Sequence, residues 1–172
     1  FIDHADYELT PPEGYKRLSP QNPEIRLRNS YILKVEEPVL DAEGNVVELK
    51  ASIDPKTLGN NPEGRKVKGV IHWVSASLGV PAEVRLYEQL FTQQDPAKID
   101  IDNLAAEINP NSLTIVEAVV EPSLAAAEAG ERFQFEREGY FVADSKDHTP
   151  VTDQSQGKPV FNRIVGLKDG FK

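Results

Sequence analysis

The stretch EIRLRNSYILKVEE, residues 24–37, alternates polar and apolar side chains over most of its length. A period of two residues is typical of a half-buried strand. Because residues i and i+2 of a strand point to the same side, Ile25 and Leu27 are expected in a core, and Arg26 and Arg28 together on the other face. Paired guanidinium groups need an explanation in a chain whose formal net charge is −9.

Similar strand patterns recur along the rest of the chain. PVLDAEGNVVELKASI is expected to form a hairpin with its turn at 41–45. Further strands are expected within 66–77, 81–91, 112–121, 131–145 and 159–169. Many short strands separated by turn residues predict an all-β fold of small barrels.

Little of the sequence favours helix. DIDNLAAEI, residues 100–108, predicts one or two short helical turns. PSLAAAEAGE, residues 122–131, is the best helix candidate, with Pro122 or Ser123 near its start and Gly130 at its end. Residues 54–66 and 145–159 are expected to be loops, the second without an apolar anchor.

Composition limits the classes of protein to consider. The 172 residues include no cysteine, which excludes disulfides and thiolate zinc sites and favours a reducing, cytoplasmic compartment. The sequence has no apolar run near the ~18 to 20 residues of a membrane helix. It begins at Phe1 and contains no methionine, so we expect a piece of a longer protein or a processed one.

The sequence offers no catalytic or metal-binding motif. The three histidines, His4, His72 and His148, are scattered without the spacing of metal ligands. His72, beside the only tryptophan, is expected to be a packed strand residue. There is no glycine-rich phosphate loop and no nucleophile elbow. We therefore expect neither a cofactor nor a metal on this chain.

The basic residues are more informative, because they are clustered within an acidic chain. A guanidinium matches phosphate or the guanine edge with two hydrogen bonds, so Arg26 and Arg28 suit nucleic-acid contact. The alternative is a solvated face, with these arginines paired to Glu24 or Glu36. Lys16 and Arg17 in GYKRL leave the same alternatives open, and GRKVKG adds Arg65, Lys66 and Lys68.

A third candidate stretch is RFQFEREGYF, residues 132–141. Strict alternation places Gln134 and Arg137 on opposite faces, so a turn within 136–139 must intervene if both serve one site. Gln and Arg suit the recognition of unstacked bases. Phe133, Phe135 and Phe141 share one parity and are expected in the core.

Eight motifs in order resemble the C-terminal anticodon-binding region of bacterial glutaminyl-tRNA synthetases, from about Tyr15 to Asp169. They are GYKRL, EIRLRNSYI, GRKVKGVIHWVSAS, EVRLYEQLF, INPNSL, EPSL, FQFEREGYF and PVFNRIVGLKD. The resemblance implies two small β-barrels related to a ribosomal protein, with strands passing between them. We expect the parts to span residues 1–107 and 108–172 and to bind glutamine tRNA. ATP and Mg²⁺ would belong to a catalytic domain outside this chain.

The resemblance also implies roles for individual residues. Lys16 and Arg17 match residues at the third anticodon base and its backbone. Arg26 and Arg28 match the arginines around the first base, and Gln134 and Arg137 match residues near the middle base. The chain departs from the pattern at Gly14, where the family can carry a glutamine.

Two alternatives remain open. A glutamyl-tRNA synthetase of the same barrel type would share these motifs. A barrel that binds ribosomal RNA or another protein would share only the fold. We expect a monomer that has no membrane partner.

Overall fold

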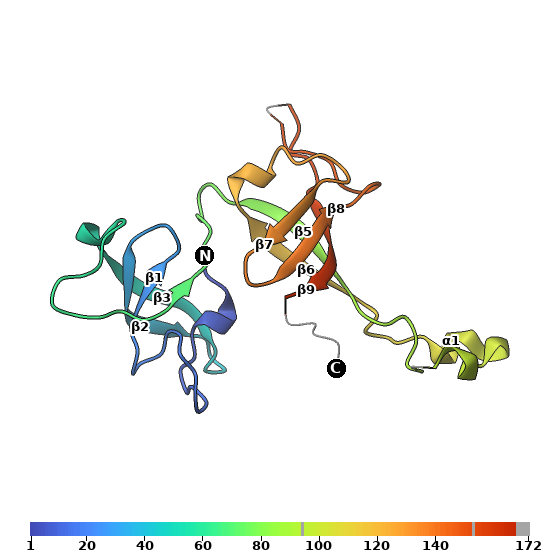
Figure 1. Cartoon of the computed structure of the whole chain (residues 1–172), viewed down its shortest axis with the longest axis horizontal. Helices are drawn as coiled ribbons and strands as arrows, with labels where there is room; N and C mark the ends of the chain where they lie inside the picture. The colour runs from blue at the N-terminus through green and yellow to red at the C-terminus, as the bar shows by residue number, and fades with distance from the viewer. Residues whose placement is uncertain (94, 153, 168–172) are drawn as a thin grey trace. The chain divides into compact units, whose positions relative to one another are not determined.

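The computed structural model describes residues 1–93, 95–152 and 154–167 (Figure 1). Strands dominate, and each helical segment of the described residues is at most four residues long. The chain divides into two compact units, residues 1–75 (unit 1) and 76–172 (unit 2). Each unit has its own sheet and its own apolar core, which confirms the all-β prediction.

Unit 1 is built on a four-stranded sheet of order β3-β2-β1-β4. Its strands are β1 (Glu24–Leu27), β2 (Ile32–Leu40), β3 (Val46–Asp54) and β4 (Val70–Ile71). Two 3₁₀ turns accompany them, η1 (His4–Asp6) and η2 (Pro55–Thr57). β1 is antiparallel to β2 but parallel to β4. The segment that leads into β4 therefore runs in the same direction as β1.

The opening stretch forms β1 and most of β2, and alternation sets its burial. Ile25 and Leu27 are buried beside Leu18, Val35 and Ile71 in the core of unit 1. The predicted hairpin is β2–β3, which confirms that interpretation. Its turn is closed by the Asp41 carboxylate, which accepts hydrogen bonds from the backbone N–H groups at positions 43 (3.0 Å) and 45 (2.8 Å).

Unit 2 is built on a five-stranded sheet of order β6-β5-β9-β8-β7. Its strands are β5 (Val80–Tyr87), β6 (Leu113–Val120), β7 (Arg132–Phe135), β8 (Gly139–Ala143) and β9 (Val160–Gly166). The connection from β5 to β6 carries η3 (Pro96–Lys98), η4 (Ile101–Asn103) and α1 (Leu104–Glu107), which confirms the short turns predicted there. Figure 1 shows this connection extending away from the sheet.

The boundary expected near residue 107 lies inside unit 2. β5 precedes that position and β6 follows it, yet the two strands pair from Val80↔Val120 to Tyr87↔Leu113. Within the described ranges each sheet takes all of its strands from one unit. The division therefore follows sheet pairing and falls at 75/76.

The helix predicted over 122–131 is wrong. Only η5 (Pro122–Leu124) is helical there, and turns follow it. The backbone N–H of Val151 donates to the Ala125 carbonyl (2.7 Å), and the His148 ring binds the Ala127 carbonyl (2.8 Å). Tertiary hydrogen bonds thus occupy carbonyls that an α-helix would need, and they override the helix propensity of the alanines.

Aromatic side chains form the centre of unit 2. Phe161 is fully buried, with its ring centroid 5.9 Å from that of Phe133 and 5.4 Å from that of Phe135. The Phe135 and Phe141 rings stack at 4.3 Å. The predicted core role of Phe133, Phe135 and Phe141 is confirmed.

The loop over 145–159 has an anchor that the sequence did not reveal. His148 is buried, and its Nδ1 accepts a hydrogen bond from the Val160 N–H (3.1 Å). The His148 and Phe161 rings also pack edge to face, with their centroids 5.3 Å apart. An imidazole that bonds two backbone segments thus replaces the missing apolar anchor.

Asp144 provides a pH-dependent contribution to the stability of unit 2. Hydrogen bonds from the Asp147 N–H, the Asn162 amide and the Lys146 N–H lower its pKa from 3.8 to about 2. A lowered folded-state pKa stabilises the fold above the unfolded pKa, and this contribution is lost as the pH falls from about 4 towards 2.

We therefore expect the free energy of unfolding of wild-type protein to fall between about pH 4 and pH 2. Asp144→Asn should lower stability at neutral pH and make that acid-induced loss shallower. Urea denaturation followed by circular dichroism at a series of pH values measures both. If the free energy of unfolding of Asp144→Asn depends on pH as that of the wild type does, other carboxylates cause the acid sensitivity.

Candidate nucleic-acid interface

The segment carrying Lys16 and Arg17 is fixed on both sides. Leu18 is fully buried, and its N–H donates to the Asp6 carbonyl (3.1 Å). The Arg17 guanidinium lies 3.0 Å from the buried Asp6 carboxylate and donates to the Ala5 carbonyl (3.2 Å). Arg17 therefore stabilises a buried anion while part of its side chain stays exposed. Lys16 is exposed and forms no ion pair with any described residue.

Gly14, just before this segment, has a φ of +82°, in the left-handed region that disfavours other residues. We expect Gly14→Gln to lower the free energy of unfolding by about 1 kcal/mol, because a Cβ is strained there although the space around it is open. Thermal unfolding checks this result, with Glu13→Gln as the matched surface control. Unchanged stability would mean that the turn can adopt another conformation.

Arg26 binds the backbone of a neighbouring loop. Its guanidinium donates to the carbonyls of Ser30 (3.0 Å), Thr57 (2.8 Å) and Asn60 (2.5 Å). The bonds to residues 57 and 60 hold the loop after β3 against β1. Arg26 thus uses three of its five N–H donors, two of them on this loop and one on the turn after β1, and it is not paired with Glu24 or Glu36.

Arg28 has different surroundings, because β1 ends at Leu27. Its side chain is exposed, whereas its backbone is held on both sides. The N–H donates to the Ile71 carbonyl (2.9 Å), and the carbonyl accepts from the Trp73 indole N–H (3.0 Å). The two arginines expected on one face therefore differ. Arg26 is half-buried and holds a loop through its hydrogen bonds, whereas Arg28 is exposed and its backbone is fixed.

Gln134 and Arg137 lie in the β7–β8 hairpin. Gln134 is exposed on β7, and the predicted turn follows, with Arg137 at a φ of +71° and the Glu138 N–H donating to the Phe135 carbonyl (3.0 Å). Gly139 ends the turn, where a Cβ would lie 2.3 Å from the Val165 carbonyl oxygen. The turn within 136–139 is confirmed, and it brings both residues into one hairpin of unit 2.

The GRKVKG segment lies beside β1 in unit 1. Arg65 lies 3.1 Å from a Glu24 carboxylate oxygen and 3.0 Å from an Asp54 oxygen. Hydrogen bonding to these two carboxylates raises the pKa of Arg65. Glu24 and Glu36 were the expected partners of the paired arginines. Glu24 instead forms an ion pair with Arg65, and Glu36 accepts a hydrogen bond from the Ser52 hydroxyl (2.8 Å).

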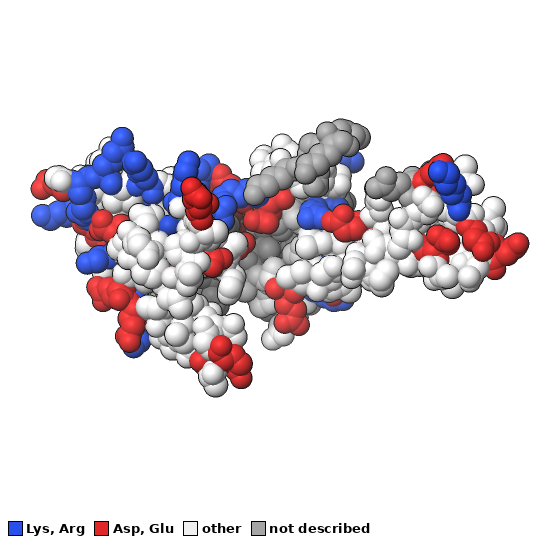
Figure 2. Space-filling view, turned by 90° about the horizontal axis from the view of Figure 1, so that it is seen from below, with Lys and Arg blue, Asp and Glu red and all other residues white. Residues whose placement is uncertain are grey.

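Charge is unevenly distributed between the units. Unit 1 has 10 Lys and Arg against 12 Asp and Glu, whereas unit 2 has 9 against 16. Figure 2 shows basic side chains gathered on one face of unit 1, and acidic ones around the α1 region of unit 2. Unit 1 is therefore the less repulsive of the two towards a polyanion.

Metal-binding clusters and membrane-spanning helices are both absent within residues 1–93, 95–152 and 154–167. No group of three or more His, Cys, Asp or Glu in these ranges is placed to hold a metal ion. In the same ranges no helix is long and apolar enough to cross a membrane.

Comparison with known proteins gives a consistent assignment. Two profiles described as "tRNA synthetases class I (E and Q), anti-codon binding domain" match residues 1–54 and 70–144. The chain is 54% identical over 177 residues to a glutamine–tRNA ligase of Ectopseudomonas mendocina, covering 99% of the chain and 30% of that protein. The corresponding ligase of Pseudomonas syringae is 53% identical over 173 residues, with 99% and 29% covered. The chain thus spans about 30% of the length of these relatives.

Proposed function

This chain belongs to the anticodon-binding domains of class I (E and Q) tRNA synthetases, and we propose that it recognises the anticodon loop of glutamine tRNA. The observation that carries this proposal is the 54% identity to a glutamine–tRNA ligase across 99% of the chain. The exposed side chains of Lys16, Arg28 and Gln134, of which the last lies on β7 and the second directly after β1, support it. Loop bases of RNA are unstacked and offer their edges to side chains of this kind.

Within unit 1, the proposal assigns two bases to two segments. Lys16 and Arg17 contact the third anticodon base and its backbone, with Arg17 oriented by Asp6 at 3.0 Å. Arg28 contacts the first base from the end of β1. Arg26 contributes at the same base through its remaining N–H donors, while it holds the loop at 57–60.

Within unit 2, Gln134 and Arg137 contact the middle base. The amide of Gln134 both donates and accepts, so it can pair with a base edge, whereas the guanidinium only donates. The β7–β8 turn carries the second residue at a fixed φ of +71°. Such a short hairpin on an aromatic core limits the entropy lost when the RNA binds.

The whole protein, by this proposal, is a cytoplasmic ligase that attaches glutamine to its tRNA using ATP and Mg²⁺. That chemistry belongs to the part outside this chain, and the chain itself is a monomeric, non-catalytic RNA-binding part. Anticodon binding would favour a productive arrangement at the distant active site, which is a coupling free energy between two sites.

A second candidate is recognition of glutamate tRNA, because the matching family description names both E and Q. The 172-residue chain can be tested by competition between labelled glutamine tRNA and unlabelled glutamine tRNA, glutamate tRNA or 5S ribosomal RNA. We expect weak, salt-sensitive binding in which glutamine tRNA is the best competitor. Better competition by glutamate tRNA would favour the second candidate, and better competition by 5S RNA would favour a ribosomal role.

A further inference from the structure

We propose that Lys66 and Lys68 bind two neighbouring phosphates of the RNA backbone, and so form a sequence-independent contact beside the base-reading residues. This inference rests on the proposed function, because it requires an RNA ligand. It concerns two residues to which the proposed function assigns no contact with an anticodon base.

The segment that carries the two lysines is held at both ends. At one end, the ion pairs of Arg65 with Glu24 and Asp54 fix its start against β1 and β3. At the other end, the Gly69 carbonyl accepts from the Arg26 N–H (3.4 Å), and β4 then pairs in parallel with β1. The lysines therefore project from a fixed backbone.

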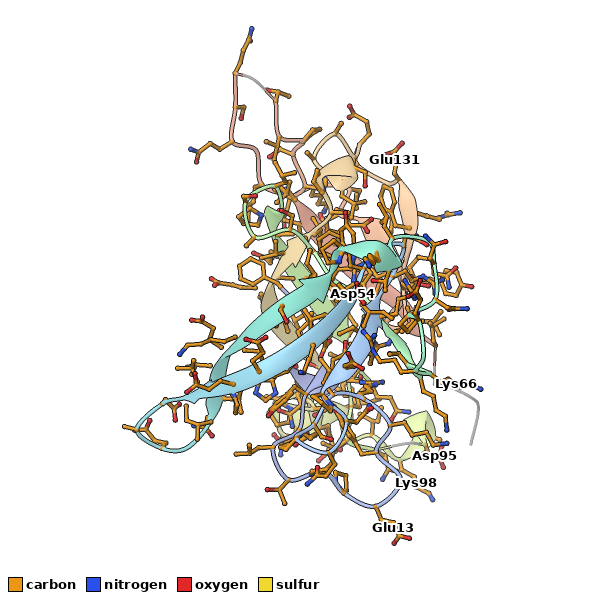
Figure 3. All side chains as sticks on the ribbon, turned by 90° about the vertical axis from the view of Figure 1, so that its left-hand side faces the viewer. Glu13, Asp54, Lys66, Asp95, Lys98 and Glu131 are labelled. Atoms are coloured by element: carbon orange, nitrogen blue, oxygen red, sulfur yellow. The ribbon has the colours of Figure 1, made fainter. Side chains whose placement is uncertain are left out.

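Both lysines of this segment face solvent. Lys66 and Lys68 are exposed, whereas Val67 between them is half-buried. The segment is not itself a strand but leads directly into β4, and side chains two residues apart on a chain are at most ~7 Å apart along it. That spacing suits consecutive phosphates of an extended strand. Figure 3 shows Lys66 pointing away from the ribbon.

The two lysines also lack the partners that neutralise cations elsewhere. Lys50 lies 2.8 Å from Glu37, and Lys158 lies 3.2 Å from Glu83. Lys66 and Lys68 form no ion pair with any residue in the described ranges. In a chain of net charge −9, two adjacent cations without partners create local attraction for an anion.

The segment lies next to the proposed base-reading residues of unit 1. A Cβ placed on Gly69 would be 3.7 Å from the Lys16 carbonyl oxygen. The neighbouring β4 strand ends at Ile71, whose carbonyl accepts from the Arg28 N–H (2.9 Å). An RNA strand that reaches Lys16 and Arg28 would therefore pass close to Lys66 and Lys68. Lysine is a point charge that suits phosphates and reads no base edge.

The double variant K66A/K68A of the 172-residue chain tests this inference. Binding of glutamine tRNA and of the same tRNA with a changed anticodon is measured by fluorescence anisotropy over a range of salt concentrations. We expect the slope of log K against log salt to become shallower by about 1.4, the value for two single-strand phosphate contacts. The loss of affinity should be equal for both RNAs, because phosphates carry no sequence information.

The matched control is K50A/K98A, which changes the net charge equally but removes two lysines that are already paired with Glu37 and Asp95. An unchanged salt slope in K66A/K68A, or an equal change of slope in the control, would overturn the inference. The proposed function would be unaffected by that result as long as the wild-type chain binds tRNA. A loss confined to one anticodon would also overturn it, in favour of base reading. Absence of tRNA binding by wild-type chain would refute the proposed function itself.

Discussion

Replacing Phe161 with alanine should lower the free energy of unfolding of unit 2 by about 3 to 5 kcal/mol, the usual cost of removing a buried aromatic ring. Phe161 is fully buried and contacts the rings of Phe133, Phe135 and His148. Its loss leaves a cavity between the β7–β8 hairpin and the loop anchor. The hairpin carries Gln134 and Arg137, which we propose to contact the middle anticodon base, so the variant should also lose recognition of that base.

The measurement uses the only tryptophan as a local reporter. Trp73 packs against the core of unit 1, so its fluorescence follows unit 1, while far-ultraviolet circular dichroism follows both units. In Phe161→Ala, the dichroism transition should shift and the Trp73 transition should stay. Phe161→Leu, which refills part of the cavity, should lose less stability. An equal shift of both signals would mean that the two cores unfold together.

Replacing Arg28 with alanine should weaken recognition of the cognate first anticodon base by about 1 to 3 kcal/mol, which is the cost of losing a bidentate base contact. The exposed side chain stands on a backbone whose N–H and carbonyl are bonded to Ile71 and Trp73, and circular dichroism of the variant checks that the fold is unchanged. Arg28→Lys should restore little, because an ammonium cannot form the planar fork.

This prediction is checked by measuring the affinity of the chain for glutamine tRNA and for a tRNA changed only at the first anticodon base. We expect a 5- to 150-fold loss on the first RNA and little change on the second, the range equivalent to about 1 to 3 kcal/mol. Lys50→Ala is the control, since it removes a cation from β3, the sheet edge opposite β4. Equal losses of affinity for both RNAs would mean that Arg28 contacts the RNA backbone and does not read the base.

Local pattern was enough to predict the strands and their cores. Alternation in the opening stretch placed Ile25 and Leu27 correctly, because strand parity puts them on one face and their apolar side chains make that face the buried one. The turn after Phe135 could also be predicted, since Gln134 and Arg137 have opposite parity and Gly139 permits a tight return.

Long-range hydrogen bonds could not be predicted from local pattern. Arg26 bonds to carbonyls at positions 57 and 60, and no periodicity encodes such partners. His148 likewise binds Ala127 and Val160, which prevents the helix that alanine propensity favoured. The paired arginines were therefore equivalent in the sequence, but in the structure they have different surroundings.

The acidity of the chain is compatible with RNA binding because it is uneven. Unit 2 holds most of the excess negative charge, and the exposed Lys16, Lys66 and Lys68 lie in unit 1. Repulsion from the acidic remainder would disfavour RNA bound away from the basic segments. Specificity would then depend on Arg28, Gln134 and the other base-contacting side chains.

The most direct test of the central claim compares how tightly the 172-residue chain binds two RNAs that differ only in the anticodon. Their dissociation constants are measured side by side at one salt concentration. Anticodon recognition predicts clearly tighter binding to the glutamine anticodon, by about 1 to 3 kcal/mol for each base changed. Equal dissociation constants for the two RNAs would contradict the account.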